Sequence, residues 1–196
     1  MDLVPALGRP KLNAMRHLLA ACALLGLLAS VAEADQRDPR LPALFSKLKT
    51  AKTVETALPI EAEIWTIWAE SDNDDVNILM HLSVDAINRE DFETALTLLD
   101  KMVEVAPDFA EGWNKRATVR YLTGDLDSSE ADVAKVLELE PRHFGALSGL
   151  GLIHLARGDA ERAQEAFQRA LEVNPTMPGP QHWVEQLKTT VEGQPI

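Results

Sequence analysis

The side chains best suited to metal binding or acid–base catalysis are histidines, and they are widely separated in this sequence. Beyond residue 34 they are His81, His143, His154 and His182. No two of them stand four residues apart, the spacing at which one helix face presents two ligands to a zinc ion. The single cysteine, Cys22, lies close to the N-terminus. The sequence therefore predicts no metal site and no cofactor.

Nucleophilic catalysis and nucleotide binding also lack their motifs. The chain has neither a G-x-S-x-G elbow nor a phosphate-binding loop. The glycine-rich run from Gly145 to Gly151 has no strand before it, and its small residues suit close helix packing. Carboxylates are numerous, but they recur at helical spacing on polar faces, and no pair stands out as an acid and a base. We predict no catalytic residues and no enzymatic activity.

An acidic run from Asp72 to Asp75 invites comparison with a calcium-binding loop. It lacks the alternating ligands, the turn glycine and the distant glutamate of such a loop. We expect instead that Asp74 or Asp75 caps the following helix.

Composition limits the remaining classes of protein. The chain has 196 residues, 46% of them hydrophobic, which suits one domain. Its net charge of −12 and pI near 4.8 argue against nucleic-acid binding, which needs lysine and arginine clustered on one face. The acidity favours neutral or basic partners.

Residues 15–34 have the pattern of a secretory signal peptide. Arg16 precedes an apolar run over residues 18–31, and Ala32-Glu33-Ala34 is a typical cleavage site. The apolar run is shorter than the roughly 20 residues that span a bilayer. We therefore assign residues 1–34 to a signal peptide, with Met15 as a second candidate for the start. The mature protein is expected in a bacterial periplasm, without a stable membrane span.

Two alternatives stay open for this segment. The run that ends at Cys22 resembles a lipoprotein processing box, and an uncleaved segment would be an N-terminal anchor. The apolar run continues well past Cys22, which favours the signal peptide. Cleavage after Ala34 would leave a mature chain without cysteine, so that no disulfide would stabilise it.

A regular repeat organises the rest of the chain. Prolines recur every 34 residues, as Pro107, Pro141 and Pro175. Aspartates recur at the same interval, each just before an amphipathic run, as Asp91, Asp125 and Asp159. An aspartate in that place accepts hydrogen bonds from the free N–H groups of a helix. Each aspartate is therefore expected to begin a helix.

Residues 76–109, 110–143 and 144–177 resemble the tetratricopeptide repeat (TPR) family, whose repeat has this same length. Small residues stand where the family's two helices touch, here Ser83, Ala117, Gly151, Ala95, Ser129 and Ala163. Two residues depart from the family pattern: Arg116, and Glu90 at the turn where the other two units have glycine. The resemblance implies an all-α fold, a right-handed superhelix of antiparallel helix pairs. It places His154 in the core, whereas His143 is expected to be solvated or to end a helix.

Atypical segments flank these three units. Residues 35–41 are predicted to be a polar linker. Residues 42–75 resemble a degenerate repeat that caps the N-terminal end, with one helix after Pro42 and a second from Pro59 to Glu70. Its Trp65 and Trp68 are expected to face the neighbouring helix. Residues 178–192 are expected to be the C-terminal capping segment, in which Pro178-Gly179-Pro180 breaks the chain and residues 181–192 form the helix, followed by a tail at residues 193–196.

The resemblance also implies a concave groove lined by the first helix of each unit. The groove residues predicted to bind a partner are Asn77, Met80, Val84, Asn88, Glu111, Asn114, Lys115, Thr118, Tyr121, Leu122, Ser148, Leu152 and Leu155. Such a mixed surface suits an extended peptide, with amides bonding its backbone, or an apolar helix. Alternatively, Leu152 and Leu155 pack against the cap or a neighbouring molecule.

One subclass of the family grips the C-terminal carboxylate of chaperones with lysine, arginine and asparagine. The matching positions hold Met80, Val84, Lys115, Gly145 and Gly149, so that clamp is absent. We therefore predict a non-catalytic protein–protein interaction scaffold in the cell envelope. Two alternatives stay open: a self-assembling structural module that forms homo-oligomers, and an accessory of envelope biogenesis that binds glycan or lipid.

Overall fold

The computed structural model describes residues 35–191, and the regular secondary structure of these residues is entirely helical. Contacts divide the chain into residues 1–31 and residues 32–196, and the described residues belong to the second unit. The predicted signal peptide and tail lie outside the described residues. None of the helices described is long and apolar enough to cross a membrane.

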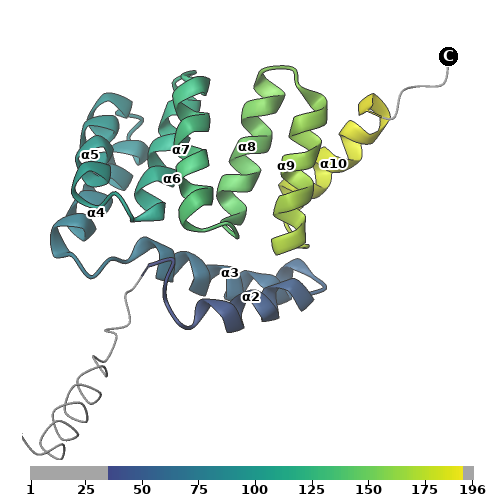
Figure 1. The fold of residues 1–196 in the computed structure, drawn as a ribbon, viewed down its shortest axis with the longest axis horizontal. Helices are drawn as coiled ribbons and strands as arrows, with labels where there is room; N and C mark the ends of the chain where they lie inside the picture. Colours follow the sequence, from purple (N-terminus) through teal and green to yellow (C-terminus); the bar gives the residue numbers. More distant parts are fainter. Residues whose placement is uncertain (1–34, 192–196) are drawn as a thin grey trace, which may run out of the picture. The chain divides into compact units, whose positions relative to one another are not determined.

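Consecutive helices pack in pairs, α4 with α5, α6 with α7, and α8 with α9 (Figure 1). The last helix, α10, packs on α9. The bounds are α2 Leu41–Thr50, α3 Val54–Ala69, α4 Asp74–Asn88, α5 Phe92–Val105, α6 Ala110–Leu122, α7 Leu126–Leu139, α8 Phe144–Ala156, α9 Ala160–Val173 and α10 Pro178–Val191. The predicted all-α class is confirmed.

Aspartate caps begin the second helix of each of these three pairs. The side chains of Asp91 and Asp125 each accept a hydrogen bond, 3.2 Å long, from the backbone N–H three residues later. Asp159 does the same over 3.1 Å. The predicted caps are therefore confirmed, and each satisfies an N–H group that the helix itself leaves free.

Small residues allow the two helices of each pair to approach closely. A Cβ atom on Gly151 would collide with the ring of Phe167 on the facing helix. Ala95, Ser129 and Ala163, on the second helices, are fully buried. The Ser129 hydroxyl also donates to the carbonyl oxygen of Ala117 over 2.8 Å, so the one polar residue among them is satisfied.

The turn inside the first pair differs from the other two. Gly124 and Gly158 have φ angles of 84° and 76°, in the left-handed region that glycine adopts without strain. Glu90 takes the same place with a φ of 58°. A side chain in this region costs on the order of 1 kcal/mol.

Two predicted helix starts on the N-terminal side were wrong. Helix α3 begins at Val54 rather than at Pro59, because Thr53 and Thr56 form a capping box that starts the helix earlier. Helix α4 is capped by Asn73, whose side chain accepts from the Asp75 N–H over 2.9 Å. The expected cap by Asp74 or Asp75 is therefore corrected, since both lie in the first turn.

The predicted break before the last helix was also wrong. Helix α10 begins at Pro178 and includes Gly179 and Pro180 in its first turn. Proline is tolerated there because the N–H groups of a first turn have no partner within the helix.

The hairpin of α2 and α3 packs on the junction between α7 and α8, at residues His143 and Phe144. The ring of Trp68 stacks on His143, with centroids 4.1 Å apart and planes 8° from parallel. Trp65 meets the edges of His143 and Phe144 at centroid distances of 5.4 and 5.3 Å. Trp68 also faces the neighbouring helix α2, as predicted, with its ring centroid 5.9 Å from that of Phe45. The hairpin thus packs at the start of α8 instead of continuing the row of pairs onto α4. Packing these aromatic rings against one another stabilises this position of the hairpin.

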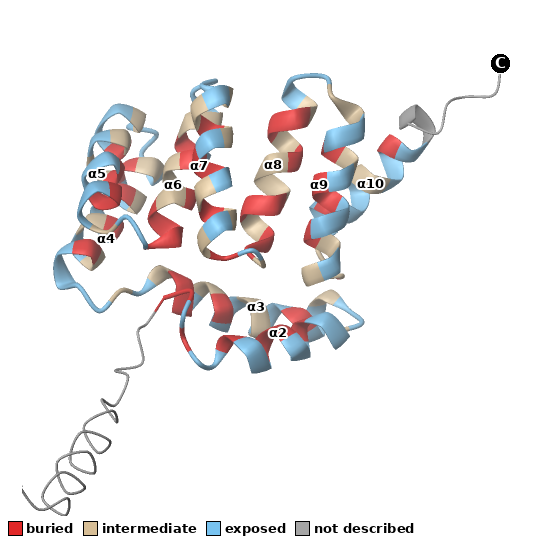
Figure 2. Cartoon of the chain, viewed as in Figure 1, coloured by how far each residue is buried: buried red, intermediate tan, exposed pale blue. Residues whose placement is uncertain are grey.

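Two further contacts hold the N-terminal segment against loops between pairs. Gln36 donates to the carbonyl oxygen of Asp108 and accepts from the Ala110 N–H, on the loop between α5 and α6. Glu61 of α3 accepts from the side chain of Asn174, which ends α9, over 2.8 Å. Residues 35–41, expected as a linker, therefore include a docked segment, and Leu41 already belongs to α2. His143, which is fully buried, is a helix cap and is not solvated. Buried residues recur along the helices of the described chain (Figure 2).

Candidate protein-binding surface

The first helices of the pairs, α4, α6 and α8, carry two hollows. The α3–α4 hollow has a volume of about 730 Å³. The α6–α8 hollow has a volume of about 80 Å³. The first is large enough for several side chains of a ligand, and the second suits one small apolar group.

The α3–α4 hollow brings together four of the predicted groove residues with residues that the repeat pattern did not indicate. The predicted ones are Asn77, Met80 and Val84 of α4 and Lys115 of α6. The others come from α4, from the end of α3 and from the linker that follows it: His81, Thr66, Ala69, Glu70, Ser71 and Asp72. One wall therefore belongs to the N-terminal hairpin, whose placement depends on contacts distant in sequence.

The α6–α8 hollow lies between neighbouring first helices. Its predicted residues are Asn114, Thr118, Tyr121 and Leu152. The remaining lining residues are mostly small or apolar: Ala117, Ser129, Val133, Gly145, Ala146, Gly149 and Ile153. A Cβ atom on Gly149 would meet no atom within 4 Å, so the absence of a side chain there leaves space in this hollow.

Asn77 uses its amide inside the protein. Its Oδ1 accepts from the Ser71 N–H over 2.9 Å, and its Nδ2 donates to the Ser71 carbonyl oxygen over 2.7 Å. These bonds hold the linker between α3 and α4 against the hollow. The amide thus shapes the wall of the hollow, and both of its polar atoms are already hydrogen-bonded.

Glu111 is a buried carboxylate, 1% exposed, at the start of α6. Its Oε2 accepts from Asn114 Nδ2 over 2.9 Å and lies 3.1 Å from His143 Nε2. Its Oε1 lies 2.8 Å from Lys115 Nζ. Three of the predicted groove residues therefore form an internal polar cluster with His143, which ties α6 to the start of α8.

The bonds of His143 define its protonation at this junction. Its Nδ1 accepts from the Ala146 N–H over 3.1 Å, so the ring proton lies on Nε2 and is donated to Glu111. Burial alone would raise the pKa of Glu111, but the hydrogen bond from His143 and the charge of Lys115 outweigh it. The pKa of Glu111 is therefore lowered, and the buried carboxylate stays charged.

Lys115 lies between the cluster and the surface. Its side chain is 30% exposed, and its Nζ is 5.8 Å from the ring centroid of Trp65. The ammonium group is thus held by Glu111 and by the face of an aromatic ring. It contributes a positive charge to the rim of the α3–α4 hollow.

The other predicted residues are dispersed. Asn88 and Leu122 are exposed at the ends of their helices, and Ser148 is half-buried. Leu155 packs with Leu152 against the cluster that joins α9 to α10. These contacts agree with the alternative that the two leucines pack on the capping helix. The binding roles of all the groove residues stay predictions.

Trp65 narrows the groove near α8. A Cβ atom on Gly145 would lie 2.5 Å from Trp65 Cη2. Only glycine therefore fits at this position of α8, because the hairpin approaches the helix so closely. This part of α8 is therefore covered by a residue of the same chain.

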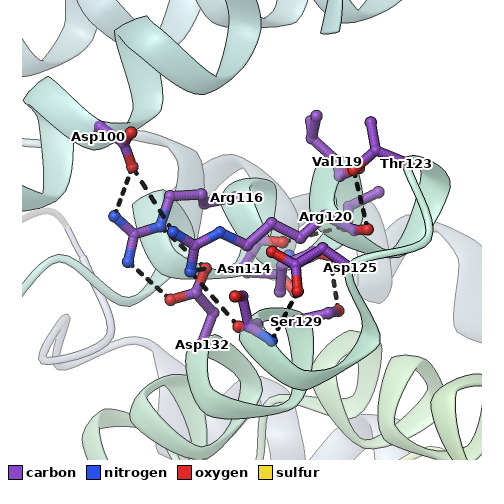
Figure 3. A network of polar contacts seen from close by, with 12 residues as sticks. Asp100, Asn114, Arg116, Val119, Arg120, Thr123, Asp125, Ser129 and Asp132 are labelled. Carbon is purple, nitrogen blue, oxygen red and sulfur yellow. Dashed lines mark hydrogen bonds and ion pairs between the residues drawn. The ribbon is translucent and has the colours of Figure 1, made fainter. Parts of the chain in front are cut away.

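Arg116, the departure from the repeat pattern, is the centre of an ion-pair network between α5, α6 and α7 (Figure 3). Its guanidinium bonds Asp132 over 2.7 and 2.9 Å and Asp100 over 2.8 Å. Arg120 adds a bond of 2.8 Å to Asp132. Burial would lower the pKa of Arg116, but these carboxylates raise it, so the arginine remains charged.

Residues 35–191 hold no group of three or more histidine, cysteine, aspartate or glutamate side chains arranged to bind a metal ion. His154, predicted to be a packed core histidine, is buried, and that prediction is confirmed.

Comparison with known proteins gives consistent results. The tetratricopeptide repeat model matches residues 82–138 and 123–178. A TPR repeat-containing protein of Rhizobium etli is 36% identical over 149 residues, which cover 76% of this chain and 73% of that protein.

Solved structures share the fold at low sequence identity. The first TPR of Spaghetti (RPAP3), bound to an HSP90 peptide, has a TM-score of 0.59 and 16% identity, covering 62% of this chain and 97% of that one. The TPR2B domain of yeast Sti1, in a complex with an Hsp70 peptide, has a TM-score of 0.56 and 18% identity, covering 60% of this chain and 99% of that one. These likenesses agree in fold, and the relative in Rhizobium etli with the matching repeats shows that the chain belongs to the tetratricopeptide repeat family.

Proposed function

We propose that the protein is a non-catalytic adaptor that binds a segment of a partner protein along α4, α6 and α8. The observation that carries this proposal is the pair of hollows on these consecutive first helices. Related folds bound to peptides, such as the Spaghetti domain with its HSP90 peptide, make a peptide ligand plausible.

The lining of the hollows suggests how such a segment is held. Met80 and Val84 give the α3–α4 hollow an apolar floor, and Tyr121 and Leu152 do the same for the α6–α8 hollow. The amides of Asn77 and Asn114 are already bonded to Ser71 and Glu111. Recognition therefore rests on apolar side chains of the partner entering the hollows, more than on amide bonds to its backbone.

A phage-displayed random peptide library tests this proposal. Peptides selected on the wild-type protein are measured against Thr118→Arg, which places a long charged side chain at the α6–α8 hollow. The matched control is Ala131→Arg, on an exposed position of α7 outside both hollows. We expect affinity to fall at least about tenfold with Thr118→Arg only. Equal binding by the two variants would contradict the proposal.

We also propose that the protein works in the bacterial cell envelope, after export. The support is the pattern of residues 15–34, with Arg16, the apolar run and Ala32-Glu33-Ala34. Fractionation of expressing cells, followed by intact-mass measurement, tests it. The expected result is a periplasmic protein that starts at Asp35. A cytoplasmic protein that retains residues 15–34 would contradict it.

A further inference from the structure

Helix α4 and its C-cap residue Arg89 carry an exposed stripe at the open end of the row of helices, which we call the α4 stripe: Asp75, Ile78, Leu82, Asp85 and Arg89. These residues recur every three or four positions, so they share one face of the helix. Ile78 and Leu82 are 56% and 47% exposed, among the most exposed large apolar residues in the described chain. The stripe is therefore apolar at its centre and charged at its ends.

The corresponding positions in the second unit contact the preceding helix pair. Gly112, one repeat after Ile78, is so close to α5 that a Cβ atom there would lie 3.0 Å from Met102 Sδ. Arg116, one repeat after Leu82, bonds Asp100 of α5 over 2.8 Å. The stripe is thus the face on which a unit normally receives its neighbour.

No helix of the described residues covers this face. The hairpin of α2 and α3, expected to cap this end, packs instead on His143 and Phe144. The opposite end is covered, since Trp183 and Leu187 of α10 pack on Phe167 of α9.

A free end of a repeat stack is expected to be polar. Here two positions of the first unit are more apolar than the matching positions of the second unit. Leu82 and Leu98 stand where the second unit has the charged pair Arg116 and Asp132. Exposed apolar residues at a place built to receive a helix indicate a docking surface.

We propose that a second copy of this chain docks on the α4 stripe, the two α4 helices packing antiparallel across a twofold axis at Leu82. Asp75 and Arg89 are equally far from Leu82, on opposite sides, each at close to two helical turns. The axis therefore brings Asp75 of each copy opposite Arg89 of its partner. Two ion pairs then flank a centre formed by Ile78 and Leu82, at whose margin Asp85 of each copy lies opposite Leu79 of its partner.

The charges on the exposed residues favour this twofold dimer over head-to-tail stacking of two copies. Within residues 35–191 neither Asp75 nor Arg89 forms an ion pair at contact distance, and the charge of Arg89 acts on Asp91 from farther away. Head-to-tail stacking would place the stripe on the outer side of α10, where His182, Glu185 and Gln186 are exposed and polar. The twofold contact uses the same stripe on both copies and closes as a dimer.

Light scattering on the full-length chain, from low micromolar to about 100 µM, measures the dimer directly. We expect the mass to rise to twice that of the monomer for the wild type and to remain monomeric for Leu82→Glu. The matched control is Leu58→Glu, on an exposed leucine of α3 that is 54% exposed, and it should dimerise normally.

A charge exchange tests the twofold register. Asp75→Arg alone and Arg89→Asp alone should each raise the dimer dissociation constant at least about tenfold, and the double variant should restore it. Circular dichroism checks that each variant remains helical. A wild type that is monomeric throughout overturns the proposal. Persistent dimers of Leu82→Glu, or no restoration by the double variant, also overturn it.

Discussion

The ring of Trp68 stacks on the ring of His143, which lies far along the chain in the junction before α8, with centroids 4.1 Å apart. His143 also caps α8 through Nδ1 and donates to Glu111 of α6 through Nε2. One buried imidazole therefore joins the N-terminal hairpin to two helices of the binding surface. The position of the hairpin and the shape of the α3–α4 hollow depend on this junction.

Replacing Trp68 by alanine should destabilise the protein by about 3 kcal/mol, since the side chain is 1% exposed and its removal leaves a cavity. Urea unfolding followed by circular dichroism measures the change. Leu58→Ala, on the exposed side of the same helix, should cost less than about 0.5 kcal/mol. Equal effects of the two substitutions would show that the hairpin does not pack as described.

Replacing Glu90 by glycine should stabilise the protein by about 1 kcal/mol, because φ at this position is 58°. The reciprocal change, Gly124→Ala, puts a side chain at a φ of 84° in the equivalent turn and should destabilise the protein. Thermal unfolding of both variants checks the two signs. A lower midpoint for Glu90→Gly would indicate that the glutamate side chain makes a stabilising contact.

Lowering the pH should weaken the contact between α6 and the start of α8 that Glu111 makes with His143. Its pKa in the folded state lies below the ordinary value of 4.5, so its contribution to stability is complete above that value. The contribution is lost as the pH falls through the lowered, folded-state pKa. In Glu111→Gln this part of the pH dependence should disappear, and stability at neutral pH should be lower.

Urea unfolding at neutral pH and at a pH below 4.5 separates this effect from that of other carboxylates with lowered pKa values, such as Asp38 and Asp91. The control is Glu138→Gln, at a largely exposed carboxylate paired with Lys135. It should keep the pH dependence of the wild type. A Glu111→Gln variant with that same dependence would contradict the assignment.

Removing the ring of Trp183 should destabilise the end of the row. The ring is parallel to Phe167 at a centroid distance of 6.4 Å and is partly exposed. The cost of Trp183→Ala should therefore be about 2 to 3 kcal/mol, at the low end for an aromatic truncation. An unchanged thermal midpoint would remove α10 from the core.

Local features of the paired helices were predictable from the sequence. The aspartate caps depend on a side chain three positions from its partner, and the contact of Gly151 with Phe167 follows from the spacing within one unit. Because the sequence pattern repeats, the same local contacts recur in three successive units. The prediction of paired helices was correct for this reason.

Long-range contacts set the parts that were not predictable. Trp68 and His143, or Gln36 and Asp108, are distant in the sequence, and neither pair shows any spacing rule. The amides of Asn77 and Asn114 found partners in their own chain because buried polar groups need hydrogen bonds. The wall that α3 adds to the α3–α4 hollow follows from the same tertiary packing.

Photo-crosslinking in the native cell tests the proposed binding surface most directly. A photoreactive amino acid is placed at Val84, in the α3–α4 hollow, at Tyr121, in the α6–α8 hollow, and at Ala131 as the control outside both. We predict that Val84 and Tyr121 capture the same partner polypeptide, that Ala131 does not, and that Thr118→Arg abolishes the capture at Tyr121. Capture of that partner from Ala131, or none from either hollow, would contradict the proposed binding surface.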